Sequence, residues 1–133
     1  MAKMNSRCAR EIAVSQPLID AWAALSTDHN PLHVSSEYAA ATPFGGTIAH
    51  GHYTLARMEE LMLDVAGERW RHGGLLQRVR FRAPVRPDHV YVLTATAHED
   101  TPDAWRLELR DESGELLAAE AEAVIGNGTI WSE

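Results

Sequence analysis

The segment from Asp28 to His33 brings a carboxylate, an amide and an imidazole close together along the chain. Pro31 lacks an N–H group and disfavours helical geometry at Asn30, so this segment is predicted to form an irregular loop. A loop can direct Asp28 and His33 at one point, where a carboxylate and an imidazole around a water molecule form a general acid/base pair. The side-chain oxygen of Asn30 can accept one proton of that water.

A helix predicted to begin near His50 supplies a site that favours negative charge. The first N–H groups of a helix have no partner within it, and the helix dipole makes this end favourable for an anion. Gly51 has no side chain, so an oxygen atom of a ligand can approach its amide closely. Such an amide can serve as an oxyanion donor to a carbonyl group whose oxygen gains charge during a reaction.

Each of these features also has a purely structural explanation. Asp28 ahead of an Asn-Pro pair is a common turn signal, and the run from His50 to His52 can be no more than the start of a helix. His29 and His33 have the helical spacing of metal ligands. Pro31 lies between them and prevents the helix interior that such ligation needs, so we expect no metal.

Hydrophobic periodicity predicts the elements that must position these residues. After a first strand, apolar residues recur with helical spacing as far as residue 66, and from about residue 74 they alternate as in strands. Ser15 and Ser36 are suited to cap the first two helices. About five antiparallel strands with helices on one face make an α+β layer. The predicted strands cover about 7–14, 75–83, 89–98, 105–110 and 117–125, and the predicted helices follow Ser15 and cover 37–41 and 50–66.

Length and composition predict one domain over residues 1–133, with 125–133 as a loosely held tail. A single cysteine, Cys8, and the lack of a CxxC motif fit a reducing, intracellular setting. The N-terminal residues lack the apolar core of a secretory signal, and no stretch approaches the ~20 apolar residues of a membrane span, so we expect a soluble, cytoplasmic protein. The net charge of −7 argues against nucleic-acid binding.

Positive charge is concentrated in one part of this acidic chain. A cluster of arginines lies between positions 69 and 86 and includes Arg78, Arg80 and Arg82. A basic surface of this kind could receive a phosphorylated ligand. The alternative is that these three arginines alternate onto the solvent face of a strand.

Taken together, the motifs resemble a known family. The runs Trp22–His33, Tyr38–Phe44 and Ile48–Gly51 closely resemble the hydratase signature of the MaoC-like family, the (R)-specific enoyl-CoA hydratases. The run Val79–Val85 is also similar to that family, so the resemblance extends over most of the chain. It implies a single hot-dog fold, in which an antiparallel sheet wraps around a long central helix.

The resemblance also implies an activity and roles for individual residues. Asp28 and His33 correspond to the catalytic dyad, Asn30 helps to hold the water, and the amide of Gly51 is the oxyanion donor. The implied reaction is reversible syn addition of water to a trans-2-enoyl thioester, which gives an (R)-3-hydroxyacyl thioester. Asp28 takes a proton from the water, and His33 helps to deliver one to Cα. No redox or metal cofactor is implied, because coenzyme A or the pantetheine of an acyl carrier protein enters with the substrate.

The chain departs from the family pattern after the His-Gly pair, where members often have methionine and this chain has His52-Tyr53. These bulkier residues are expected to reshape the acyl pocket. Single-unit members pair their sheets edge to edge, so the resemblance implies a homodimer. The candidate substrate-binding residues are Phe44, His50, His52, Tyr53, Arg78, Arg80 and Arg82.

Two other functions fit the same features. A hot-dog thioesterase would use the same fold and a thioester but would attack the carbonyl carbon and hydrolyse the thioester C–S bond. A non-catalytic subunit that binds thioesters or a partner protein would keep only the scaffold. The combination of Asp28, Asn30 and His33 favours the hydratase.

Overall fold

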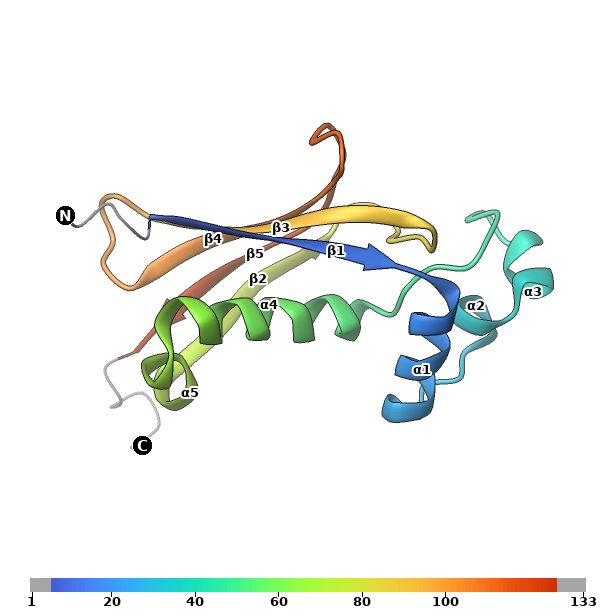
Figure 1. Ribbon diagram of the computed structural model, residues 1–133, viewed down its shortest axis with the longest axis horizontal. Helices are drawn as coiled ribbons and strands as arrows, with labels where there is room; N and C mark the ends of the chain where they lie inside the picture. The colour runs from blue at the N-terminus through green and yellow to red at the C-terminus, as the bar shows by residue number, and fades with distance from the viewer. Residues whose placement is uncertain (1–5, 127–133) are drawn as a thin grey trace.

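A five-stranded antiparallel sheet curves over one long helix in the computed structural model, which describes residues 6–126 (Figure 1). The strand order is β1-β3-β4-β5-β2, so β1 and β2 form the two edges. Every pair of neighbouring strands is antiparallel. This arrangement confirms the predicted α+β class. The strands are β1 (Arg7–Val14), β2 (Gly74–Phe81), β3 (His89–Ala97), β4 (Ala104–Asp111) and β5 (Leu117–Ile125).

The helices form two groups on the concave side and at one end of the sheet (Figure 1). The long helix α4 lies along the sheet, while three helices before it gather at one end. Ser15 caps the first of them as predicted, because its side-chain oxygen accepts the Leu18 N–H at 3.2 Å. The helices are α1 (Gln16–Ser26), α2 (Pro31–Val34), α3 (Ser36–Ala40), α4 (Gly51–Ala66) and α5 (Glu68–Gly73).

Helix α3 begins one residue earlier than the sequence pattern predicted. Ser35, rather than Ser36, is its N-cap, and the Ser35 side chain accepts the Tyr38 N–H at 3.2 Å. Two adjacent serines are equally able to cap a helix, since both carry a short side-chain oxygen. Only the path of the chain after α2 decides between them.

Strand β2 contains an irregularity that the alternation of its arginines did not predict. Its pairing with β5 shifts register between Gln77 and Arg80. Arg78 at this point adopts the left-handed conformation with φ of 55°. An extra residue of this kind breaks the two-residue side-chain period of a strand. The three arginines from Arg78 to Arg82 therefore do not form one simple alternating row.

The core lies between the sheet and α4. The buried face of the helix includes Met58, Leu61 and Met62, which belong to one cluster with Leu93 of β3 and Leu107 of β4. Burial of this apolar surface fixes the long helix against the sheet. The first turn of α4 is thereby held in place at the end where α1 to α3 gather.

The C-terminal end of the sheet is more firmly held than predicted. Ile125 is the last residue of β5, and the Gly126 N–H donates to Gly73 O at 3.0 Å. The rest of the predicted tail, 127–133, lies outside the described residues.

None of the helices between residues 6 and 126 has the length and apolar character required to cross a membrane.

We predict that Leu107→Ala lowers the free energy of unfolding by about 2–5 kcal/mol, because it leaves a cavity in the core. Leu107 is 0% exposed, whereas Leu25 on α1 is 74% exposed and provides a matched control. Leu25→Ala should change stability by less than about 0.5 kcal/mol. Denaturant-induced unfolding measures both values. Equal losses for the two variants would contradict this position of the core.

Candidate active site

The site begins where α1 ends and the chain turns toward α2. Thr27 is the C-cap of α1 in the left-handed conformation, with φ of 64°, and Asp28 follows it. Asp28 Oδ1 accepts the Asn30 N–H at 3.2 Å, and Asn30 Oδ1 accepts the Leu32 N–H at 3.0 Å. These two side chains therefore shape the turn into α2.

His33 lies in α2, a single helical turn, so the prediction of an irregular loop up to His33 was wrong. Proline is excluded from a helix interior but suits the first helical position, where its N–H would have no partner. Pro31 occupies that position, and Asn30 is the N-cap. The side-chain oxygen predicted to hold a water accepts a backbone N–H here, so Asn30 helps to position His33.

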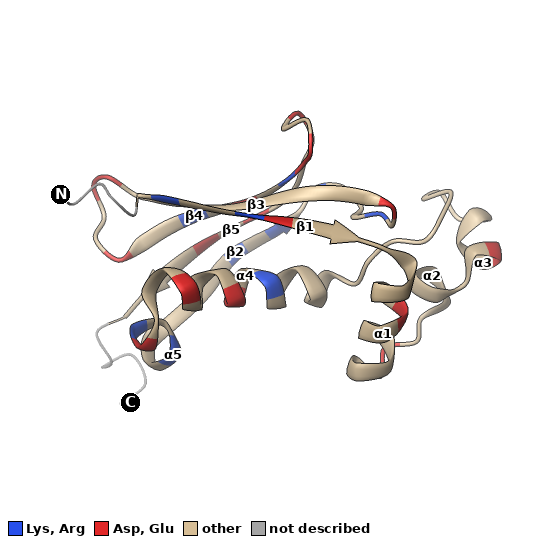
Figure 2. Ribbon diagram, in the orientation of Figure 1, with Lys and Arg blue, Asp and Glu red and all other residues tan. Residues whose placement is uncertain are grey.

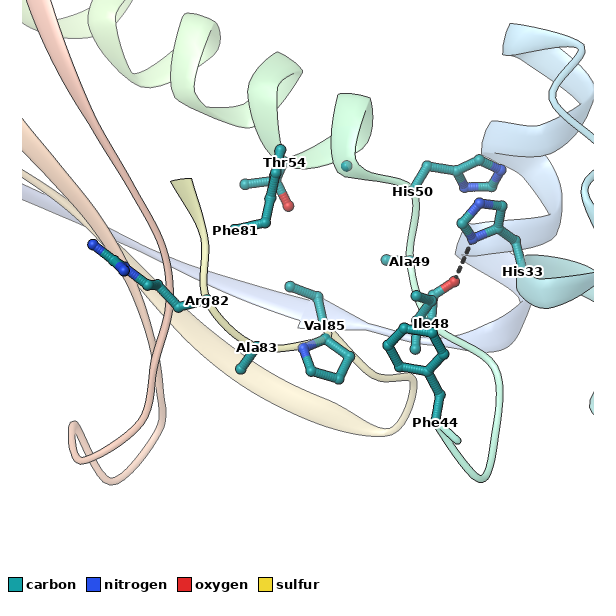
Figure 3. Close-up of a pocket in the computed structure, with 12 residues that line it drawn as sticks. His33, Phe44, Ile48, Ala49, His50, Thr54, Phe81, Arg82, Ala83 and Val85 are labelled. Carbon is teal, nitrogen blue, oxygen red and sulfur yellow. Dashed lines mark hydrogen bonds between the residues drawn. The ribbon is translucent and has the colours of Figure 1, made fainter. Parts of the chain in front are cut away.

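The imidazole of His33 is oriented by a backbone carbonyl. Its Nδ1 lies 2.8 Å from Ile48 O, a contact drawn as a dashed line in Figure 3. A carbonyl oxygen can only accept, so Nδ1 carries the proton and Nε2 of the neutral ring keeps a free lone pair. The backbone of His33 is also held, because Gln16 Nε2 donates to its carbonyl at 2.9 Å. No sequence motif had indicated Gln16.

His50 joins the Asp28 turn to the start of α4. It is only 1% exposed, and its Nε2 donates to the backbone carbonyl of Asp28 at 2.9 Å. Its ring stacks on the ring of His33 with 3.9 Å between centroids. Burial is the largest cause of the lowered pKa of His50. The neutral ring is therefore the favoured form, and its lone pair is on Nδ1.

Asp28 and His33 lie at a separation that one water molecule can bridge. Side-chain atoms of Asp28, His33 and His50 all lie within 4.8 Å of one another. Two hydrogen bonds of about 2.8 Å that meet at a water oxygen span about 4.6 Å. An ionised Asp28 and Nε2 of His33 are both acceptors, so a water between them donates both protons and leaves its lone pairs free to attack.

The ionised form of Asp28 is stabilised by its neighbours. His52 Nε2 lies 3.1 Å from Asp28 Oδ2. This hydrogen bond is the largest cause of the lowered pKa of Asp28, followed by the backbone N–H of Asn30. A general base must be deprotonated to accept a proton. The lowered pKa therefore suits Asp28 to that role near neutral pH.

The same three residues, Asp28, His33 and His50, are the group whose atoms come close enough to hold a metal ion. Their geometry is unfavourable for one. The His33 and His50 rings are stacked with 25° between their planes. Imidazole lone pairs lie in the ring plane, so those of two stacked rings do not converge on one ion at the ~2.0–2.1 Å that zinc requires.

A cavity of about 380 Å³ lies beside His33 and His50, between the start of α4 and the end of β2 (Figure 3), whereas Asp28 is not part of its wall in the described residues. His33 and Gly51 both line it, so the imidazole and the helix N-terminus share one space. The remaining wall is largely apolar. It consists of Phe44, Ile48, Ala49, His50, Thr54, Phe81, Arg82, Ala83, Pro84 and Val85.

Gly51 is part of the wall of this cavity. Gly51 is the first residue of α4, where helical pairing leaves N–H groups open. The ring of Phe81 lies against it, since a Cβ atom on Gly51 would come within 3.1 Å of Phe81 Cζ. A side chain at position 51 would crowd this contact. Glycine therefore allows the Phe81 ring to pack closely against the start of α4.

Apart from Arg82, the cavity wall from β2 and the loop after it was not predicted. Phe81, Pro84 and Val85 lie far from Asp28 in the sequence. The Ala49 N–H donates to Val85 O at 2.7 Å, which joins this loop to the segment before α4. The run Val79–Val85, which resembles the family, is the signal that could have indicated these residues.

The predicted substrate-binding residues have different positions. Phe44 lines the cavity, and so does Arg82, although Figure 3 shows the Arg82 side chain directed away from it. His52 and Tyr53 are outside the cavity wall in the described part of the chain. Tyr53 is buried, and its hydroxyl accepts a hydrogen bond from Arg57 at 2.9 Å.

The predicted arginine cluster borders a separate shallow groove on the sheet, where it meets acidic residues of β5. Arg82 and Arg106 both contact Glu120 at 2.6 Å, and Arg78 lies 3.7 Å from Glu122. Figure 2 shows the basic residues of β2 near the acidic residues of β5. Ion pairing therefore neutralises part of the positive charge that the sequence suggested. The groove is lined by Arg78, Arg80, Arg82, Arg106, Glu120, Ala121 and Glu122.

Comparison with protein-family models identifies the family of this chain. The model described as the MaoC like domain matches residues 2–110, which is most of the chain. This chain belongs to the MaoC-like dehydratase family.

Individual relatives agree with this assignment. The chain is 42% identical over 77 residues to 3-hydroxyacyl-thioester dehydratase Z of Mycobacterium tuberculosis, covering 56% of this chain and 51% of that protein. It is 35% identical over 99 residues to 3-hydroxybutyryl-CoA dehydratase of Methylorubrum extorquens, and the match covers 72% of this chain and 60% of that protein. The chain thus spans about half to three fifths of the length of these curated relatives.

A solved structure supports the fold of this MaoC-like chain. The (R)-hydratase from A. caviae involved in PHA biosynthesis is similar with a TM-score of 0.70 and 25% sequence identity. The match covers 90% of this chain and 92% of that one. The predicted hot-dog fold, an antiparallel sheet around a long central helix, is therefore confirmed.

The burial of His50 leads us to predict how the free energy of unfolding depends on pH. Its pKa is lowered in the folded protein below the ordinary value of 6.5, so the unfolded chain binds this proton more readily. Stability should therefore fall as pH drops below about 6.5. His50→Asn removes the titrating group and should make the fall between pH 7.5 and pH 5.5 smaller. Denaturant midpoints at both pH values measure the difference, and identical falls would contradict a buried neutral His50.

Proposed function

We propose that this chain is an (R)-specific hydratase/dehydratase, which adds water reversibly to trans-2-enoyl thioesters to give (R)-3-hydroxyacyl thioesters. One observation carries the proposal. The Asp28 carboxylate and the His33 imidazole come within 4.8 Å of each other, close enough to share a water, and His33 lines a cavity together with Gly51 at the start of α4. The names of the relatives, a 3-hydroxyacyl-thioester dehydratase and a 3-hydroxybutyryl-CoA dehydratase, support it.

The proposed reaction moves one proton and forms one C–O bond. The water donates hydrogen bonds to Asp28 and His33, and its oxygen attacks Cβ of the enoyl group as the C=C π bond breaks. One proton passes to the dyad as the bond forms, the hydroxyl group stays on Cβ, and the dyad returns the proton to Cα. Addition of the hydroxyl group and the proton to the same face of the enoyl double bond gives syn hydration. The reverse sequence releases water from the 3-hydroxyacyl thioester.

The Gly51 amide has an electrostatic role in this proposal. Attack at Cβ moves negative charge onto the thioester oxygen as an enolate forms. A helix N-terminal N–H stabilises that charge, and removal of one such donor in a protease raised the barrier by about 3 kcal/mol. Asn30 supports the reaction by holding α2 and, we infer, by a contact with the water.

The carrier, assembly and location are further parts of the proposal. The acyl chain enters the apolar cavity, and the arginine groove receives the phosphates of coenzyme A or of an acyl carrier protein. Pairing of edge strands across a two-fold axis makes a homodimer, whose boundary lies near the pantetheine arm. The reaction needs no cofactor beyond the carrier in the substrate. We place the protein in the cytoplasm on the basis of its sequence.

The first test is hydration of crotonyl-CoA and of a longer trans-2-enoyl-CoA, followed by loss of enone absorbance. Asp28→Asn and His33→Ala should each lower kcat by about 10²- to 10⁴-fold, because each removes one member of the acid/base pair. His72 is exposed and belongs to α5, so His72→Ala is a matched control that should retain activity. Folded Asp28→Asn and His33→Ala proteins with undiminished rates would contradict the proposal.

The products of the same reactions separate the alternatives. Formation of the (R)-alcohol without free thiol supports the hydratase. Release of thiol would assign a thioesterase instead. No reaction with either coenzyme A ester or with the corresponding acyl carrier protein esters would leave the non-catalytic binding role.

The arginine groove has its own test. Arg78→Ala, Arg80→Ala and Arg82→Ala should each raise KM severalfold with little change in kcat, because phosphates bind arginine through charge-assisted hydrogen bonds. The increase in KM should be smaller at high salt, because salt screens exposed charges. Steady-state kinetics with coenzyme A and acyl carrier protein substrates measure it. Unchanged Michaelis constants for all three variants with both carriers would remove phosphate binding from this groove.

A further inference from the structure

His52 lies outside the cavity wall and forms the middle of a hydrogen-bonded chain that ends at Asp28. Its Nδ1 lies 2.7 Å from Trp22 Nε1, and its Nε2 lies 3.1 Å from Asp28 Oδ2. Trp22 belongs to α1, His52 to the first turn of α4, and Asp28 to the turn between α1 and α2. The chain of contacts thus links a helix, the loop that follows it and a second helix.

The chemistry of these three groups defines which tautomer of the His52 ring fits both contacts. The indole N–H of Trp22 is a donor only, so Nδ1 of His52 must offer a lone pair. The proton of the neutral ring is then on Nε2, where it is donated to the Asp28 carboxylate. Protonation of Nδ1 would break the contact with Trp22. Trp22 therefore selects the tautomer that donates to Asp28.

Trp22 is itself held by the core. Its ring meets the ring of buried Tyr53 edge to face, with 5.3 Å between centroids. The Tyr53 hydroxyl accepts a hydrogen bond from Arg57, one turn further along α4. His52 is 44% exposed as a side chain, so these contacts, rather than burial, limit its movement.

The hydrogen bond from His52 completes the orientation of the Asp28 carboxylate. Oδ1 accepts the Asn30 N–H, and Oδ2 accepts the His52 N–H. One donor on each oxygen defines both the position and the plane of the group. Each oxygen has a further lone-pair site, so the carboxylate can still accept a proton from water.

We propose that His52, with its tautomer selected by Trp22, is a positioning residue that orients Asp28 to take a proton from the attacking water. This inference rests on the proposed function and names a further residue pair that serves it. His52 acts through Asp28 and touches neither the water nor the substrate.

The neighbouring titratable groups determine the sign of the expected pH effect. The Asp28 carboxylate is close to His52, His33 and His50, and the rings of His50 and His52 are 5.1 Å apart. The hydrogen bond from His52 lowers the pKa of Asp28 more than the other contacts do. Its loss should raise that pKa, so that Asp28 becomes protonated, and inactive as a base, at a higher pH.

The test compares His52→Met, His52→Gln and Trp22→Phe. Methionine cannot donate to Asp28, so kcat should fall about tenfold with little change in KM, and the acid limb of kcat/KM should move to higher pH. Glutamine has both a donor and an acceptor and should restore most of the rate. Phenylalanine keeps an aromatic ring but removes the indole N–H. Trp22→Phe should therefore move the acid limb of kcat/KM to higher pH, as His52→Met does.

Two control variants remove equivalent groups away from the site. Trp70 donates its indole N–H to Glu59 at 2.7 Å, and His72 lies on the exposed face of α5. Trp70→Phe and His72→Met should leave the pH profile of the folded enzyme unchanged. A merely structural role of His52 would lower the folded fraction but would not move the acid limb.

Nitrogen NMR separates failure of this inference from failure of the proposed function. The Nε2–H tautomer of His52 and a hydrogen-bonded Trp22 indole should both be seen in the wild type. An active enzyme whose kcat and pH profile are unchanged by His52→Met would overturn the role of His52 alone. A protein that shows the expected NMR signals but hydrates no enoyl thioester would overturn the proposed function, and the positioning role with it.

Discussion

The hydrogen bond from His50 to the backbone carbonyl of Asp28 is the contact on which the site depends. It joins the turn after α1 to the residue immediately before α4, two segments that otherwise belong to different parts of the fold. His50 is almost completely buried, and a hydrogen bond shielded from water is electrostatically stronger than an exposed one. The acid and the helix N-terminus therefore keep a fixed relation to each other.

Three histidines surround Asp28, and each gives one N–H to an oxygen acceptor. His33 donates to Ile48, His50 to the Asp28 backbone and His52 to the Asp28 side chain. In this pattern each ring has a defined donor nitrogen, while the carboxylate carries the local negative charge. An acid that stays ionised and an imidazole with a free Nε2 are suited to a water molecule that must lose a proton.

The sheet contributes to the site from the opposite side. Burial of the α4 face holds the helix N-terminus in place, and the end of edge strand β2 brings Phe81 against Gly51. The register shift near Arg78 lies in the same strand. Arg78 of β2 and Arg82 just after it pair with Glu122 and Glu120 of the neighbouring strand β5. Strand β2 and the loop after it thus border both the apolar cavity and the polar groove.

The sequence by itself determined most of the elements and which chemical groups are available to the proposed dyad. Alternation and helical spacing are local properties, so strand β1, the Ser15 cap and helix α4 were predictable within a residue or two. Asp28, His33 and Gly51 were identified because their motifs are short and resemble a known family. The one-turn helix at Pro31 was missed, since the same residue that ends a helix can also begin one.

Only the tertiary structure decided which partners these residues have. The stacking of His33 on His50, the pairing of His52 with Trp22 and the contact of Phe81 with Gly51 join residues from separate elements. His52 could be read from its position as part of the acyl pocket, yet it faces Asp28. The tautomer of each histidine is likewise decided by an acceptor or donor brought from elsewhere in the fold. Local sequence sets which groups are present, but hydrogen bonds between distant segments set their orientation and charge.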